Sequence, residues 1–200
     1  VSQMLSWAPA IERLGIPAYN WWSEGIHGIG RAGTATVFPQ AIGMAAAFDE
    51  DMMEQVGNAV GVEARGKYNM CRAHGDRDIF KGLTVWAPNI NIFRDPRWGR
   101  GHETYGEDPF LTSRLGVRFV EGMQGDDPDY LQAAACAKHF AVHSGPESDR
   151  HHFNAIVSKQ DLWETYLPAF RALVKEAGVE AVMGAYNRTN GEPCCGSKTL

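Results

Sequence analysis

Short apolar runs alternate along this chain with stretches whose apolar residues recur at helical spacing, and this alternation constrains the fold more than any other feature. The runs 133–137 and 179–185 are almost continuously apolar, which is typical of strands buried on both faces of a parallel sheet. Helices that connect such strands cover the two faces of the sheet. The sequence therefore predicts an α/β fold.

The apolar runs and their spacing also suggest how large the sheet is. Strands are expected at 17–22, 41–47, 83–90, 132–137 and 179–185. A complete (β/α)8 barrel needs about 250 residues, whereas this chain has 200. We therefore expect a TIM-type (β/α)8 barrel that is incomplete on its C-terminal side, with about five of its eight strands present. A complete but smaller doubly wound sheet is the alternative.

Three helices have clear starting signals. Asp49 precedes an acidic first turn and an apolar stripe, and Asp108 is followed by Pro109, the residue best tolerated at the first helical position. A third helix is expected to begin after Ser158. Pro168 lies inside that third helix and is expected to kink it.

The composition excludes several classes of protein. Hydrophobic residues make up 44% of the chain and charged residues 22%, as in globular domains with a buried core. The net charge of −5 argues against a nucleic-acid partner, because such proteins usually carry a basic excess. The longest apolar stretches, such as 44–48, are far shorter than the roughly 20 residues of a membrane span.

The two ends suggest a piece of something longer. The chain starts at Val1 without a leader-like segment, and it stops at Leu200 just after a loop rich in Gly, Pro and Cys. We expect residues 1–200 to form a single domain whose later strands, and a second domain, are absent from the chain. The compartment stays open between periplasm, exterior and cytoplasm, and the oligomeric state is equally open.

Aromatic, charged and amide side chains gather where the predicted strands end. They occupy the segments 19–28, 89–109, 138–154 and 186–191. Aromatic faces pack on the C–H surfaces of sugar rings, and charged groups hydrogen-bond sugar hydroxyls. No glycine-rich phosphate-binding motif follows a strand. The pattern therefore favours a carbohydrate ligand.

The strings YNWWSEGIHG, NIFRDPRWGRGHETYGEDP, AAACAKHF and MGAYNRTNGEPCCG carry a resemblance. They resemble the N-terminal catalytic domain of family 3 glycoside hydrolases, most of all the β-xylosidase/α-arabinofuranosidase branch. The resemblance implies a retaining β-glycosidase that uses no cofactor. Its substrates would be oligosaccharides from which it removes non-reducing terminal β-D-xylosyl, glucosyl or arabinosyl residues.

The same resemblance implies a set of substrate-binding residues. Glu24, where glucosidase-like members usually have Asp, would grip ring hydroxyls, and Lys138 and His139 would bind adjacent hydroxyls. The full set is Glu24, Arg100, Lys138, His139, Arg150, Met183 and Tyr186. Plainer interpretations stand beside these: Glu24 as a surface carboxylate, Arg100 paired with Glu103 for structural reasons, and Met183 as a core residue.

The chain departs from the family at the reaction centre. The family's nucleophile is an Asp in a Gly- and Val-rich strand beyond the YN segment, and its general acid usually comes from a following domain. Neither motif occurs in these residues. Because a retaining glycosidase needs two carboxylates about 5–5.5 Å apart, no catalytic residue is predicted here, and the chain alone is expected to be inactive.

Three alternatives to a β-xylosidase remain. A β-glucosidase of the same family is the nearest, and xylosidase is favoured because Glu24 is one methylene longer than Asp and would occupy the space of glucose's hydroxymethyl group. A non-catalytic sugar-binding protein is the second. A metal-dependent hydrolase is the third, but His139 and His143 lack the HExxH glutamate and the four cysteines lack zinc spacing, so no metal site is predicted.

Overall fold

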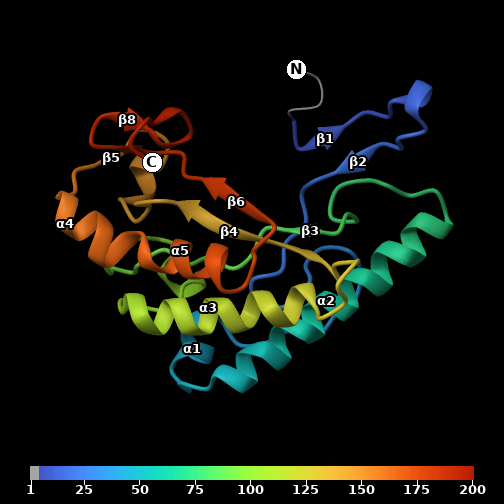
Figure 1. The fold of residues 1–200 in the computed structure, drawn as a ribbon, viewed down its shortest axis with the longest axis horizontal. Helices are drawn as coiled ribbons and strands as arrows, with labels where there is room; N and C mark the ends of the chain where they lie inside the picture. Colours follow the sequence, from blue (N-terminus) through green and yellow to red (C-terminus); the bar gives the residue numbers. More distant parts are fainter. Residues whose placement is uncertain (1–4) are drawn as a thin grey trace.

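Three parallel strands form the centre of the molecule, and their order confirms an α/β fold (Figure 1). The computed structural model describes residues 5–200. The strands are β3 (Thr84–Val85), β4 (Ala134–Phe140) and β6 (Ala181–Gly184), in the order β3-β4-β6. Ser23 adds one parallel bridge to Val85, so the segment around Ser23 lies beside the free edge of β3.

Three helices cover one face of this sheet, with α3 (Pro109–Gln124) packed between α2 (Glu50–Ala73) and α5 (Pro168–Lys175) (Figure 1). The caps of α2 and α3 are the predicted ones. The side chain of Asp49 accepts a hydrogen bond from the N–H of Met52, and that of Asp108 accepts one from Leu111. Each cap satisfies a backbone donor that the helix itself leaves free.

The crossing of α2 and α3 depends on glycines. A Cβ atom at Gly122 would lie 2.0 Å from the carbonyl oxygen of Glu54, and one at Gly57 would lie 2.3 Å from that of Phe119. Both neighbours are backbone atoms, which cannot rotate away. The two helices therefore approach as closely as they do only because these positions carry no side chain.

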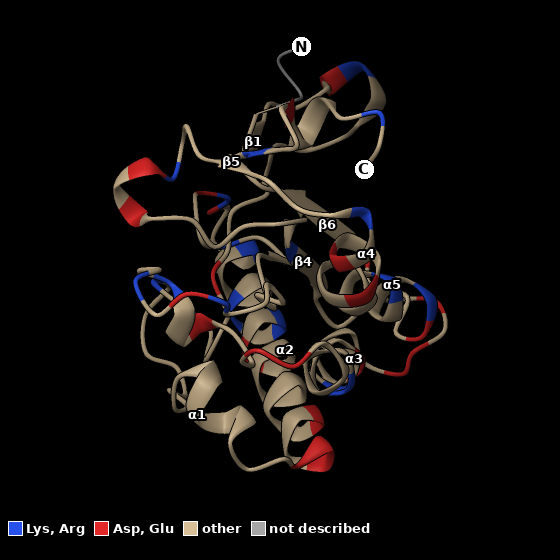
Figure 2. Ribbon diagram, turned by 90° about the vertical axis from the view of Figure 1, so that its left-hand side faces the viewer, with Lys and Arg blue, Asp and Glu red and all other residues tan. Residues whose placement is uncertain are grey.

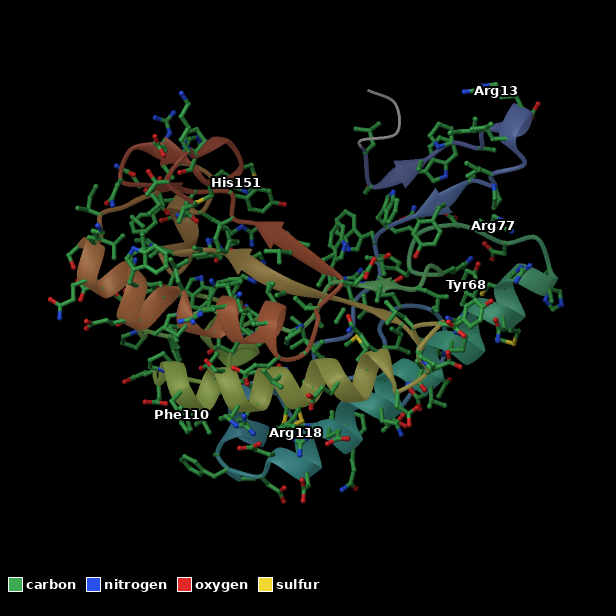
Figure 3. The ribbon with its side chains drawn as sticks, in the orientation of Figure 1. Arg13, Tyr68, Arg77, Phe110, Arg118 and His151 are labelled. Carbon is green, nitrogen blue, oxygen red and sulfur yellow. The ribbon has the colours of Figure 1, made fainter. Side chains whose placement is uncertain are left out.

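Charged side chains join the same two helices. The first turn of α2 is acidic, as Figure 2 shows in red, and this placement suits the positive end of the helix dipole. Arg118 on α3 lies against α2 (Figure 3), with its Nη1 atom 3.1 Å from Glu54. Arg114 pairs with Glu50 at 2.7 Å. These partly exposed pairs add little stability each, so burial of the apolar faces dominates the packing.

The third predicted helix is divided into separate elements at Pro168, where the sequence predicted a kink. It begins with α4 (Lys159–Asp161), capped by Ser158, and continues as a wider π turn, η5 (Leu162–Tyr166), before α5 starts at Pro168. The N–H of Leu167 bonds to the carbonyl of Leu162, five residues back. A proline has no N–H for the helical ladder, so the chain restarts its helix at that residue.

The prediction of a strand at 41–47 is wrong, because this segment contains the helix α1 (Ala41–Ala45). Its buried residues Ala41, Met44 and Ala45 recur at helical spacing. A short apolar run does not distinguish a strand from a buried helix, and this one contains alanine and methionine, which favour helix, with only one β-branched residue, Ile42.

The expected strand at 17–22 is reduced to β2 (Tyr19–Asn20), which pairs with β1 (Trp7–Ala8) in an antiparallel ribbon outside the parallel sheet. The expectation of about five barrel strands was therefore too high: within residues 5–200 the central parallel sheet has three strands, extended by the bridge at Ser23, and the parallel pair β5–β7 belongs to a separate small sheet. The remaining elements are short: β5 (Asn154–Ala155), β7 (Arg188–Thr189), β8 (Glu192–Pro193), η2 (Glu12–Leu14), η3 (Gly101–Glu103), η4 (Glu147–Asp149) and η6 (Cys194–Gly196).

The core lies between the sheet and the helices. Its largest fully buried apolar side chains are Phe119, Met53, Ile90, Leu115, Met123 and Leu173. Among the helices of residues 5–200, none is both long and apolar enough to cross a bilayer.

The glycine crossing can be tested with a matched pair of substitutions. Gly122→Ala should lower the free energy of unfolding by about 1–3 kcal/mol, because the new methyl group meets backbone. Gly66→Ala, on the exposed side of α2 with nothing within 4 Å of the new atom, should raise it by up to about 1 kcal/mol. Urea unfolding followed by circular dichroism measures both. Equal effects of the two substitutions would contradict the close approach.

Candidate functional site

The carboxyl ends of the parallel segments meet at one edge of the sheet and bring charged side chains together there. Lys138 lies near the end of β4 and is only 3% exposed. Its Nζ atom is 3.8 Å from the Oε2 atom of Glu24, which follows the bridge formed by Ser23. Two residues that are 114 positions apart in the sequence (24 and 138) thus form an ion pair at the sheet edge.

Glu24 is held from two sides. The indole N–H of Trp22 donates to Oε1 at 2.7 Å, and the ammonium group of Lys138 lies on the side of Oε2. Trp22 is itself fixed by stacking on Trp86, with ring centroids 4.8 Å apart. The carboxylate remains partly exposed. It is therefore a positioned acceptor rather than a free surface group.

Arg100 and Glu103 form a two-pronged ion pair. The distances are 2.9 Å from Nε to Oε1 and 2.5 Å from Nη2 to Oε2, and the amide of Asn89 donates to Oε2 at 3.3 Å. Burial by itself would raise the pKa of Glu103, but the hydrogen bonds and charge of Arg100 outweigh it and hold the pKa below its usual value. Glu103 therefore stays ionised as the counter-ion of Arg100.

The structural pairing that the sequence left open for Arg100 is thus present, but it does not occupy the whole guanidinium. The Nη1 atom of Arg100 lies 3.0 Å from Nε2 of His139. Arg100 therefore links η3, which carries Glu103, to the end of β4. An arginine held on both sides has little rotational freedom left, which suits recognition of a ligand in one orientation.

Burial controls the protonation of the two residues at the end of β4. Removal from water lowers the pKa of His139 well below its usual value, and the positive charges of Arg100 and Lys138 lower it further. Burial also lowers the pKa of Lys138, while the carboxylate of Glu24 acts in the opposite direction. His139 is therefore a neutral imidazole at neutral pH.

A cavity of about 450 Å³ opens above this network. Its polar lining includes Glu24, His27, Arg31, Arg100, Glu103 and Arg150. Three of the predicted site residues, Glu24, Arg100 and Arg150, thus share one cavity, and Lys138 and His139 are buried against two of them.

The remaining predicted residues lie to one side of the cavity. Tyr186 follows β6 and is 64% exposed, and the guanidinium of Arg150 lies 5.9 Å from its ring centroid. The ring of His151, which is labelled in Figure 3, lies 4.7 Å from the ring of Tyr186. Met183 lies within β6, opposite Lys138 in the ladder. Neither Tyr186 nor Met183 lines the cavity.

Sequence reasoning missed the polar residues behind the site. Asn89 and Asn91 are 1% and 2% exposed, and both contact the charged network or the backbone of β4. The signal that could have indicated them is the alternation Asn-Ile-Asn-Ile just after β3, where every second residue is polar.

Histidines also cluster here, and the rings of His139 and His143 are 4.8 Å apart. The Nδ1 atom of each ring is hydrogen-bonded to an asparagine, Asn91 or Asn187. Within the described part of the chain, no three His, Cys, Asp or Glu side chains are arranged to hold a metal ion.

The sequence of this chain is similar to those of known glycosidases. Over residues 1–200 the chain matches the family described as the glycosyl hydrolase family 3 N terminal domain. It is 53% identical to a xylan 1,4-beta-xylosidase of Xylanibacter ruminicola, over 98% of this chain and 23% of that protein. It is 46% identical to the probable beta-D-xylosidase 7 of Arabidopsis thaliana, over 100% of this chain and 28% of that protein.

The fold of this chain is also similar to those of solved glycosidase structures. The chain resembles the exo-beta-xylosidase XlnD, determined with a xylobiose aziridine probe, with a TM-score of 0.86 and 35% identity over 100% of this chain and 27% of that one. For a beta-glucosidase from Kluyveromyces marxianus the TM-score is 0.82, with 36% identity over 97% of this chain and 21% of that one.

These matches confirm the resemblance carried by the sequence motifs. The chain spans about a quarter of the length of the curated relatives it matches. The chain belongs to glycosyl hydrolase family 3, and its residues 1–200 match the N-terminal domain of that family.

Proposed function

We propose that this chain is the sugar-binding part of a retaining β-glycosidase that removes non-reducing terminal β-D-xylosyl residues from oligosaccharides. One observation carries the proposal: Glu24, Arg100 and Arg150 line one cavity at the carboxyl edge of the sheet, with Lys138 paired to Glu24 beneath it. Relatives and solved neighbours named xylosidases support xylose, and those named glucosidases keep a β-glucosidase as the second candidate.

The chemistry of the cavity suits a sugar ring. A carboxylate accepts hydrogen bonds from hydroxyls and a guanidinium donates them, and charge-assisted bonds of this kind are roughly twice as strong as neutral ones. Glu24 and Arg100 are each held in place by neighbours, so little side-chain freedom is lost when a ligand binds. The two groups would contact different hydroxyls of one terminal sugar.

The length of Glu24 supports xylose over glucose. Xylose lacks the hydroxymethyl group of glucose, and a glutamate reaches one methylene further into a pocket than an aspartate. Trp22 fixes the direction of that reach through its hydrogen bond to Oε1. One methylene in a pocket changes discrimination by about 1–3 kcal/mol, so the effect is a preference between two related sugars.

The carboxylates of this site are engaged in binding rather than bond breaking. Both oxygens of Glu103 are bonded to Arg100, and both oxygens of Glu24 face a donor or a cation. Retaining hydrolysis needs one free carboxylate as nucleophile and a second, protonated one as general acid. We propose that the nucleophile and the general acid come from outside residues 1–200.

The proposed architecture follows from the same reasoning. Residues 1–200 would form a single domain, the larger part of a (β/α)8 barrel in a longer protein, and further strands and a second domain would complete it. The parallel order of β3, β4 and β6 and the matched fraction of the relatives support this arrangement.

Shortening Glu24 tests the preference for xylose. In the full-length protein, Glu24→Asp should move the ratio of kcat/KM for aryl β-glucoside over aryl β-xyloside toward glucose by about tenfold or more, because space for the hydroxymethyl group is restored. Glu121→Asp, on α3 away from the cavity, serves as the control. A ratio that stays unchanged, or moves toward xylose, would contradict the role of Glu24.

The absence of catalytic carboxylates from this site can be tested on the chain itself. Purified residues 1–200 should show no turnover of an aryl β-xyloside, while the full-length protein should hydrolyse it. A parallel preparation with Arg100→Ala controls for contaminating enzymes, since a contaminant is indifferent to the substitution. Turnover that depends on Arg100 would refute the placement of both catalytic groups outside the chain. An inactive full-length protein that still binds xylose would point to a sugar-binding protein instead.

A further inference from the structure

The side chain of Asn91 is buried behind the site, and the polypeptide backbone alone determines its orientation. Its Nδ2 atom lies 2.8 Å from the carbonyl oxygen of His139 and 3.2 Å from that of Ala141. Its Oδ1 atom lies 2.9 Å from the backbone N–H of His139. Backbone carbonyls only accept and backbone N–H groups only donate, so the amide has one orientation that satisfies all three contacts.

This orientation determines where His139 carries its hydrogen. The Oδ1 atom of Asn91 also lies 2.9 Å from Nδ1 of His139, and an amide oxygen can only accept. The hydrogen of the neutral ring must therefore be on Nδ1, which leaves Nε2 with a free lone pair. Arg100 reaches Nε2 at 3.0 Å and can only donate, so the contact on the other side of the ring requires the same tautomer.

We propose that Asn91 is a positioning residue of the site: it holds the hydrogen of His139 on Nδ1 and thereby reserves Nε2 as the acceptor for Arg100. Three of the five N–H groups of Arg100 are then bonded, two to Glu103 and one to His139. The other two remain for a ligand in the cavity. Their use on a sugar rests on the proposed function, whereas the tautomer does not.

The environment keeps the ring of His139 in its neutral form. Burial lowers the pKa of His139, and the charged or titratable groups that face it, Arg100, Lys138, His143 and Arg150, lower it further. A second hydrogen on Nε2 would point at the N–H of Arg100, so protonation would break the contact that Asn91 sets up.

A second pair in the same region has the same asparagine-to-histidine hydrogen bond and two bonds from the amide nitrogen to backbone carbonyls, but it lacks the arginine and the bond from a backbone N–H to Oδ1. The Nδ2 atom of Asn187 lies 2.8 Å from the carbonyl oxygens of Val142 and Arg188, and its Oδ1 atom lies 3.0 Å from Nδ1 of His143. The Nε2 atom of His143 is buried and has no hydrogen-bond partner among the described residues. The Asn187–His143 pair is therefore a matched control for the Asn91–His139 pair.

Neutron diffraction tests the tautomer directly. Deuterium-exchanged crystals of the full-length protein at about pH 7 should show deuterium on Nδ1 of His139 and none on Nε2. Deuterium on Nε2, alone or together with Nδ1, would overturn the proposal. This result does not depend on activity, so it stands or falls separately from the proposed glycosidase function.

Substitution of Asn91 tests the consequence for the site. Asn91→Asp keeps the acceptor for Nδ1–H but loses the two Nδ2 bonds to backbone carbonyls, a loss that Asn187→Asp shares. Its negative charge also favours the doubly protonated ring, whose new Nε2–H opposes Arg100. We expect kcat/KM for an aryl β-xyloside to fall about tenfold at pH 5 relative to the parent protein and to recover as the pH rises and His139 loses its second hydrogen.

The control substitution is Asn187→Asp, which should change kcat/KM much less because His143 has no arginine partner. Thermal unfolding identifies variants that fail to fold. A loss that is the same at every pH, or an equal loss in Asn187→Asp, would show that Asn91 is only structural and would overturn the proposal.

Discussion

The ammonium group of Lys138 at the end of β4 is the constraint on which the site depends. A positive charge removed from water is costly unless opposite charge and hydrogen bonds compensate it. Glu24 supplies a negative charge 3.8 Å from the ammonium group. The carboxylate of Glu103 also favours the charged form of Lys138, but more weakly than Glu24 does. Each charged side chain of the site thus requires another, and removing one would leave its partner uncompensated.

The helices that cover one face of the sheet make this arrangement at its edge possible. Gly57 and Gly122 let α2 and α3 cross closely, and the apolar faces of both helices bury the strands. A rigid sheet then holds the ends of β3 and β4 in fixed register, with Thr84 opposite Ala134. The positions of the strands determine where the side chains at the sheet edge lie. The packing of α2 and α3 against the strands therefore determines the distances between the charged groups of the site.

Sequence-based predictions were most reliable where a single residue type determines the local backbone conformation, as at helix caps and at proline. Asp49 and Asp108 cap helices, as predicted, and Pro168 disturbs the third helix at the predicted position, where one helix ends and α5 begins. The signals failed where burial alone was used: the segment 41–47 is apolar but contains a helix, and the segment 17–22 contributes only two residues to an antiparallel ribbon. An apolar run indicates that a segment is buried, but the elements that pack against the segment determine whether it is a helix or a strand.

The sequence by itself determined the α/β class through the alternation of apolar runs with helical stretches, which is a local pattern. Motifs such as YNWWSEGIHG, RDPRWGR and KHF, which are local too, determined the family and most of the charged residues near the cavity. Only the tertiary structure decided which of them act together. It placed Glu24 beside Lys138, joined Arg100 to both Glu103 and His139, and left Tyr186 and Met183 outside the cavity. It also placed Asn91 behind the site, where its side chain bonds to backbone atoms of residues that are 48 and 50 positions away along the chain. Such contacts depend on how strands pair, and no local pattern encodes that pairing.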